Sequence, residues 1–201
     1  MLLDEAKIDP RVKRTKQLLQ KALMELLEEQ SFHNVTVQDI AARAEVNRAT
    51  FYAHFEDKYA LLNYSIREHF QTLLDSRLPP DPRLTMENLR IVTLTVHEFL
   101  SEFLDRCAPV HHSNEEAMMV MQVQRQLHDT LLSWTTRSSA QFKGKQKAEV
   151  IATVVSWAIW GTAAQASGCH GHKFASTEIA DQVLALLKTG LQDYLQDEVQ
   201  V

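Results

Sequence analysis

Apolar residues recur at intervals of three and four along most of this chain. That spacing places them on one face of an α-helix, whose period is about 3.6 residues. No segment shows the alternation of apolar and polar residues typical of a half-buried strand, and the 201 residues include only 5 glycines and 5 prolines. The pattern therefore predicts an all-α protein. We expect long helices at about 11–29, 57–76, 85–106, 113–134, 147–167 and 176–196, and two short helices within 36–55.

Residues 36–55 predict a helix, a turn and a second helix. Asn47 suits the start of the second helix, because its side-chain oxygen can accept a hydrogen bond from a free backbone N–H. Phe51 and Phe55 lie four positions apart and should face inward together. A short helix with a buried aromatic edge and a polar outer face suits insertion into the major groove of DNA. The first helix is lined by Val37, Ile40, Ala41 and Ala44, and the outer face of the second is formed by Arg48, Ala49, Thr50, Tyr52, Ala53 and His54.

The same stretch, continued to Lys58, resembles the DNA-binding domain of the TetR (tetracycline-repressor-like) regulators. One departure is Glu45, which stands where the family often has glycine before the apolar residue of the turn. Because a non-glycine residue with positive φ is uncommon, we expect an altered or strained turn. The resemblance covers the first quarter to third of the chain. It is carried by Thr36, Ile40-Ala41, Val46-Asn47, Thr50-Phe51-Tyr52, His54-Phe55 and Asp57-Lys58.

The resemblance implies a three-helix helix-turn-helix head over residues 1–57 and a helical ligand-binding and dimerisation body over 58–201. It also implies seven DNA contacts. Arg48, Ala49 and Thr50 would reach base edges, where arginine can donate two hydrogen bonds to guanine. The expected phosphate contacts are Thr36, Tyr52, His54 and Lys58.

A run of five basic residues and no acid, from Arg11 to Lys21, can add phosphate contacts beside this motif. The alternative is an ordinary solvated helix face, since residues 1–60 hold 9 Lys and Arg against 10 Asp and Glu. The whole chain has a net charge of −5, so composition alone does not indicate nucleic acid. The basic run therefore depends on the motif for its interpretation.

The last two predicted helices are apolar over more than one stripe, and 161–166 are mostly small residues. A face this wide is a candidate dimer surface, and the resemblance implies a homodimer through this helix pair and its symmetry mate. The alternative is that the extra face is buried within one copy. Nearer the middle of the chain, aromatic and sulfur-containing side chains either fill a core or line an apolar effector pocket with two histidines as polar groups. The candidates for that pocket are His97, Phe99, Phe103, Met121, His128, Trp134, Trp157 and Trp160.

Other chemistry has weaker signals. The cluster Cys169, His170 and His172 lacks a standard zinc spacing and reads better as a polar loop, so we expect no metal or cofactor. No Ser-His-Asp signature, glycine-rich phosphate loop or HExxH motif indicates an enzyme. The first residues do not form a signal peptide, no apolar run approaches about 18 residues, and two cysteines make no disulfide framework. We therefore expect a cytoplasmic protein.

These observations predict a transcriptional regulator that binds double-stranded DNA. The resemblance implies a repressor on a palindromic operator, released by a small-molecule effector that the sequence does not identify. Two other classes remain open. One is a helical ligand-binding or adaptor protein that acts through protein contacts without sequence-specific DNA binding, and the other is a small all-α enzyme.

Overall fold

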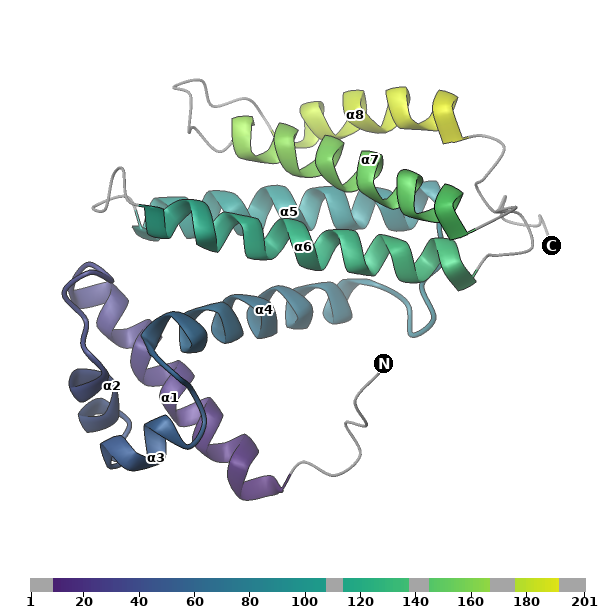
Figure 1. Ribbon diagram of the computed structural model, residues 1–201. Helices are drawn as coiled ribbons and strands as arrows, with labels where there is room; N and C mark the ends of the chain where they lie inside the picture. Colours follow the sequence, from purple (N-terminus) through teal and green to yellow (C-terminus); the bar gives the residue numbers. More distant parts are fainter. Residues whose placement is uncertain (1–8, 108–113, 138–144, 167–175, 192–201) are drawn as a thin grey trace. The chain divides into compact units, whose positions relative to one another are not determined.

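The computed structural model describes residues 9–107, 114–137, 145–166 and 176–191. In that part of the chain every regular element is a helix, which confirms the all-α prediction (Figure 1). The helix ends lie within a few residues of those expected. The helices are α1 (Pro10–Glu29), α2 (Val37–Arg43), α3 (Arg48–Tyr52), α4 (Lys58–Arg77), α5 (Met86–Cys107), α6 (Asn114–Arg137), α7 (Lys145–Ala164) and α8 (Ser176–Leu191).

The helices form two compact units, which we call the head and the body. The head contains α1, α2, α3 and the first part of α4, through Ile66. The body begins at Arg67 and contains the rest of α4, α5 through Asp105, and α6 to α8. The division falls inside α4 rather than at its first residue, where the sequence suggested a boundary at 57. One continuous helix therefore belongs to both units.

The head is built around the apolar face of α1. That face is buried, as its spacing predicted, and α2 packs against α1. Phe51 of α3 is fully buried, with its ring centroid 6.0 Å from that of Phe55. The predicted aromatic edge therefore faces inward. The buried side chains of the head include Leu19, Ala22, Leu23, Leu26, Phe32, Val35, Ile40, Ala41, Phe51 and Phe55.

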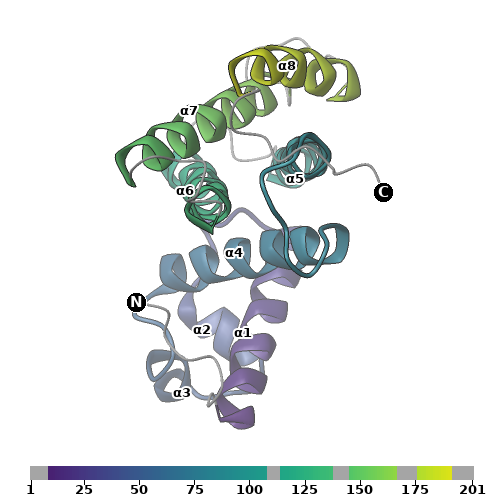
Figure 2. The same ribbon diagram turned by 90° about the vertical axis from the view of Figure 1, so that its right-hand side faces the viewer.

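The body is a set of long helices in which α6 packs extensively against α7, and α7 against α8 (Figure 2). Its core is made mainly of aliphatic side chains at helical spacing, with Trp134 among the largest fully buried residues. None of the helices in the described part of the chain is both long and apolar enough to cross a membrane. The buried residues include Leu89, Val92, Val96, Leu100, Leu127, Leu131, Ala152, Val155 and Ile159.

Candidate nucleic-acid interface

The start of α3 is fixed by Asn47. This residue has extended backbone angles, and its Oδ1 accepts hydrogen bonds from the Thr50 backbone N–H at 2.7 Å and from the Thr50 hydroxyl at 3.0 Å. A cap of this kind satisfies a backbone donor that a helix start otherwise leaves unpaired. Because Phe51 anchors the opposite side of the same helix, α3 is held in one orientation despite having only five residues.

The turn before α3 contains the strain that the sequence suggested. Glu45 has a φ of 54°, in the left-handed region that favours glycine. The turn is closed by hydrogen bonds from the Val46 N–H to the Ala41 carbonyl, at 2.9 Å, and from the Glu45 N–H to the Ala42 carbonyl, at 3.1 Å. A side chain in this conformation costs about 1 kcal/mol relative to glycine. These two hydrogen bonds therefore hold the turn in this conformation although residue 45 is not a glycine.

The outer side of α3 and the turn after it present side chains expected to contact bases (Arg48, Ala49, Thr50) and phosphates (Tyr52, His54). Arg48 and Ala49 are exposed, Tyr52 is 50% exposed, and Thr50 and His54 are half-buried. The Arg48 guanidinium lies 6.0 Å from the centre of the Tyr52 ring, close enough for a cation–π contact that steadies it. The structure thus brings these five predicted contacts together on one helix and the turn that follows it.

Thr36 begins α2 and forms a reciprocal cap with Asp39. The Asp39 N–H donates to the Thr36 hydroxyl at 3.2 Å, while the Thr36 hydroxyl and N–H donate to the Asp39 carboxylate at 2.6 and 2.9 Å. The hydrogen bond from the Thr36 side chain, followed by that from its backbone, lowers the pKa of Asp39 below its usual 3.8. Sequence reasoning overlooked Asp39, although a Thr followed three residues later by an acid is a recognised cap signal.

A bidentate ion pair joins the ends of α1 and α2. Arg43 donates from its two terminal nitrogens to the two carboxylate oxygens of Glu29, at 2.9 and 2.8 Å, and lies 3.7 Å from Glu25. The hydrogen bond between Arg43 and Glu29 raises the pKa of the arginine and lowers that of the carboxylate. Arg43, a basic residue of the helix-turn-helix, therefore forms an ion pair within the head. This pair was not foreseen, since its partners are 14 positions apart.

Lys58 is placed differently from the other expected phosphate contacts. Its Nζ donates to the backbone carbonyls of Phe32, His33 and Val35, at 2.9, 3.0 and 2.9 Å. It also lies 4.6 Å from the centre of the Phe32 ring. An ammonium group has three donors, so these carbonyls occupy all of them. A direct phosphate hydrogen bond would require one of these contacts to break.

The basic run lies on the first turns of α1. Arg11, Lys13 and Arg14 are exposed, whereas Lys16 is half-buried, with its Nζ 5.0 Å from the centre of the Tyr64 ring. Both views show this end of α1 and α3 at the same end of the head (Figures 1 and 2). Positive charges at a helix N-terminus oppose the helix dipole, which favours anions there. Their clustering beside α3 therefore suits an external anion such as a DNA phosphate.

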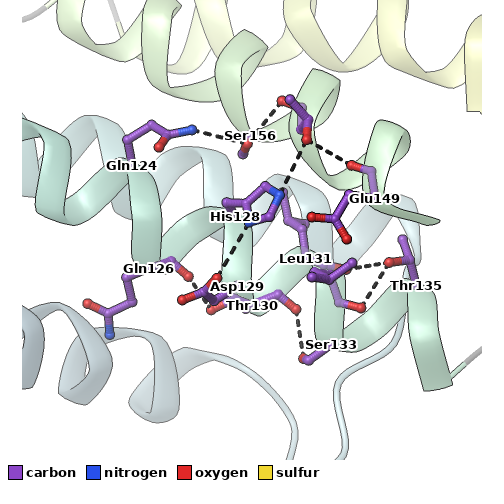
Figure 3. Close-up of polar contacts among 12 residues, drawn as sticks. Gln124, Gln126, His128, Asp129, Thr130, Leu131, Ser133, Thr135, Glu149 and Ser156 are labelled. Atoms are coloured by element: carbon purple, nitrogen blue, oxygen red, sulfur yellow. Dashed lines mark hydrogen bonds and ion pairs between the residues drawn. The ribbon is translucent and has the colours of Figure 1, made fainter. Parts of the chain in front are cut away.

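The residues expected to line an effector pocket differ in their burial and in their hydrogen bonds. His128 bridges α6 and α7, with Nε2 3.3 Å from the Thr153 hydroxyl and Nδ1 3.4 Å from Asp129 (Figure 3). Next to it, the Gln124 amide lies 3.4 Å from the Ser156 hydroxyl (Figure 3). His128 is thus part of a polar seam between two helices rather than a polar group left for a ligand.

The other members of that set divide into buried and exposed side chains. Phe99 and Trp134 are buried in the core, whereas Met121 and Trp157 are 45% and 44% exposed. Trp160 is half-buried, and its indole N–H is buried without a hydrogen-bond partner. The side chain of Phe103 and the cluster Cys169, His170 and His172 lie outside the described residues. In the part of the chain that the structure covers, no three histidine, cysteine or acidic residues group as metal ligands do.

His97 is the most unusual of these residues. It is only 1% exposed, and neither ring nitrogen has a hydrogen-bond partner. Burial lowers the pKa of His97 below its usual 6.5, because a charged imidazolium loses its hydration there. The imidazole is therefore neutral near pH 7, with one donor and one acceptor unpaired.

A short, capped, aromatic-anchored helix with a polar outer face defines the head as a helix-turn-helix DNA-binding domain. Residues 19–64 match the family model described as bacterial regulatory proteins, tetR family. This match includes Thr36 to Lys58, so the resemblance of the head to this family is confirmed.

Two curated relatives match over part of their length. The chain is 39% identical over 72 residues to the uncharacterised HTH-type transcriptional regulator YxbF of Bacillus subtilis (strain 168), covering 35% of this chain and 19% of the relative. It is 30% identical over 61 residues to the HTH-type dhaKLM operon transcriptional activator DhaS of Lactococcus lactis subsp. lactis (strain IL1403), covering 30% of this chain and 33% of the relative. The chain thus spans about a fifth to a third of these relatives.

Solved structures extend the likeness over most of the chain. The transcriptional regulator FadR from Bacillus subtilis, in complex with stearoyl-CoA, matches with a TM-score of 0.56 at 17% identity, over 87% of this chain and 98% of that chain. At this identity the likeness shows the fold alone. Over most of its length the chain therefore has the same fold as this regulator.

Proposed function

We propose that this protein is a DNA-binding transcriptional regulator that represses its target by occupying a palindromic operator. The observation that carries the proposal is the outer face of α3, where Arg48, Ala49 and Tyr52 are exposed on a helix fixed by Asn47 and Phe51. Arginine can bind guanine bidentately, and small apolar groups can contact the thymine methyl. Repression requires only occupancy of the DNA, whereas activation requires a further surface for the transcription machinery.

The phosphate contacts of the proposal surround this face. Tyr52 and His54 follow the base-reading residues, and Thr36 starts the neighbouring helix. Arg11 and Arg14 of α1 add exposed positive charge at the same end of the head. Such contacts fix the position of a protein on the duplex without reading its sequence. The base contacts from α3 and these phosphate contacts together supply what specific recognition needs.

A homodimer accounts for an apolar stripe on the body. Val150, Val154 and Trp157 lie on one face of α7 and are 55%, 58% and 44% exposed, and Leu186 of α8 is 79% exposed. These residues are not buried within one copy, which weighs against the alternative that the monomer hides the whole face. A second copy would cover them and place two recognition helices about 34–36 Å apart. Sedimentation of the free chain over a range of concentrations tests this assembly.

A small-molecule effector acting through the body is the second part of the proposal. The buried, unpartnered polar atoms of His97 and Trp160 support it, because buried polar groups are normally hydrogen-bonded and these two lack a partner. An effector would release the operator only by binding better to the form that cannot hold DNA. Native mass spectrometry of protein purified from its own host would detect a retained molecule. A retained molecule whose removal leaves operator binding unchanged would count against this part.

DNA binding is tested with duplexes that the purified protein selects from a random library. We expect selection to yield a palindrome, bound with an affinity that falls steeply with salt, because phosphate contacts release counterions. Thr50→Val should change the preferred bases, whereas Thr72→Val, an exposed threonine of the body, should not. Selection that yields no sequence preference would favour the adaptor protein. In vitro transcription from a promoter containing the palindrome then distinguishes repression from activation.

A further inference from the structure

The ammonium of Lys58 lies at the centre of three carbonyl groups. Nζ is 2.9, 3.0 and 2.9 Å from the carbonyl oxygens of Phe32, His33 and Val35, which are all hydrogen-bond distances. The Phe32 carbonyl also accepts the Val35 N–H at 3.2 Å, so the same oxygen helps to close the turn. An ammonium has three donors and no acceptor. Each donor therefore has a partner within the head.

The three carbonyls belong to the segment that leads from α1 into α2. On the inner side of this segment, Phe32 and Val35 are buried in the core of the head. On the other side, the carbonyls are held by Lys58, the first residue of α4. Thr36, which directly follows Val35 in the chain, caps α2. Whatever moves this segment therefore moves the start of α2, and with it the turn that carries α3.

The first turn of α4 is itself well anchored. The Asp57 carboxylate accepts the Ala60 N–H at 2.7 Å and so caps this helix. A lysine at a helix N-terminus is disfavoured by the helix dipole, and the three carbonyl oxygens offset that cost by surrounding the charge with acceptors. Lys58 is thus a cross-link between α4 and the α1–α2 segment, made over 23 to 26 positions of sequence.

We propose that Lys58 is a positioning residue that sets α2 and α3 from α4, and that it makes no direct phosphate contact. This inference rests on the proposed DNA-binding function and changes the role expected for one of its residues. Lys58 is the first residue of α4, a helix that continues past Ile66 into the body.

The test compares Lys58→Arg and Lys58→Met in the full-length chain, on the duplex selected by the wild-type protein. Arginine keeps the charge, but its planar fork cannot place donors on three converging carbonyls. A positioning role predicts that both variants bind at least tenfold more weakly to every duplex tested, below the temperature at which they begin to unfold. The dependence of log affinity on log salt should keep the wild-type slope. Both variants should also lose about 4 °C or more of thermal stability, as expected when a contact within a small unit is broken.

Arg14→Gln serves as the charge control, because it removes one exposed positive charge from the same unit. Loss of a phosphate contact should lower the salt slope by about 0.9 per contact and leave thermal stability unchanged, and we expect this of Arg14→Gln. That behaviour in Lys58→Met, together with wild-type binding by Lys58→Arg, would overturn the inference.

Two further results would also overturn it. In one, the variants lose thermal stability but bind DNA with wild-type affinity while folded, which would indicate a purely structural role for Lys58. The other is wild-type behaviour of both variants throughout. A wild-type chain that selects no sequence fails at an earlier step and counts against the proposed function itself.

Discussion

The polar side chains that fix the helices of the head are mostly exposed and hydrogen-bonded, whereas the body contains a few buried polar atoms that have no partner. In the head, Thr36, Asn47 and Asp57 each cap a helix. Lys58 gives all its donors to carbonyls, and Arg43 pairs with Glu29. Among the described residues, the buried side-chain atoms without a hydrogen-bond partner all belong to the body. They are both ring nitrogens of His97, Oε1 of Gln126 and Nε1 of Trp160.

This difference suits two tasks. A surface that reads DNA should be formed before the DNA arrives, because ordering it on binding would cost affinity. A region that responds to a ligand needs groups whose hydrogen bonds are completed only when the ligand is present. A buried polar atom without a partner costs about 1–3 kcal/mol. The body therefore carries a cost that a bound molecule could remove, whereas no buried side-chain atom in the described part of the head lacks a hydrogen-bond partner.

The largest expected effect is a difference in acid sensitivity. Burial lowers the pKa of His97 below 6.5, so between pH 6.5 and that lowered value the unfolded chain binds a proton that the folded body does not. The body should then lose up to about 1.4 kcal/mol of stability for each pH unit below 6.5. Tryptophan fluorescence during urea unfolding measures this, because all three tryptophans lie in the body. His97→Leu should remove the dependence, and His69→Gln, at an exposed position, should keep it.

The head should respond in a lower pH range. The pKa values of Glu29 and Asp39 are lowered from 4.5 and 3.8, so the stability from these carboxylates is present above those values and is lost as the pH falls through the lowered ones. Far-UV circular dichroism follows both units. A loss of the helical circular dichroism signal at pH 5 to 6 without a change in tryptophan fluorescence would mean that the head unfolds before the body. That result would contradict this prediction.

A smaller effect is expected from the cap of α3. Asn47→Ala removes the acceptor of the Thr50 N–H and should destabilise the head by about 1 kcal/mol. Urea unfolding followed by circular dichroism measures the change. Asn47→Asp is the matched control, since it keeps the accepting oxygen and the stability but adds a negative charge where DNA would approach. An alanine variant as stable as the wild type would show that the head does not depend on its caps.

The smallest effect is expected from His97→Leu at pH 7.5. This substitution tests directly whether the unpaired imidazole destabilises the body. Leucine has a similar volume and no polar atoms, so replacing an unpaired imidazole should leave stability unchanged or raise it by up to about 1 kcal/mol. The same fluorescence-detected unfolding gives the value. A loss above 1 kcal/mol would mean that His97 has a hydrogen-bond partner in solution. The contrast between the two units would then disappear.

Features that depend on residues close together in the chain could be predicted before the fold was known. Helical spacing gave the helices to within a few residues, and Asn47 was identified as a cap because its partner lies three positions along. The departure from glycine at Glu45 predicted a strained turn, and φ is positive there. The Thr36–Asp39 cap was equally readable in the sequence, yet it was overlooked. Such contacts form within a single turn, so the local sequence specifies them.

Contacts between residues that are far apart in the chain became known only from the packing of the helices. Lys58 contacts carbonyls 23 to 26 positions away, and Arg43 contacts Glu29 at a separation of 14. Trp157 and Trp160 are three positions apart in one helix, yet one is 44% exposed while the other has a buried N–H. These outcomes depend on how helices pack, and a periodic pattern fixes the face of a helix but not what covers it. Hence the family resemblance implied a phosphate contact for Lys58, whereas the fold places its ammonium among backbone oxygens.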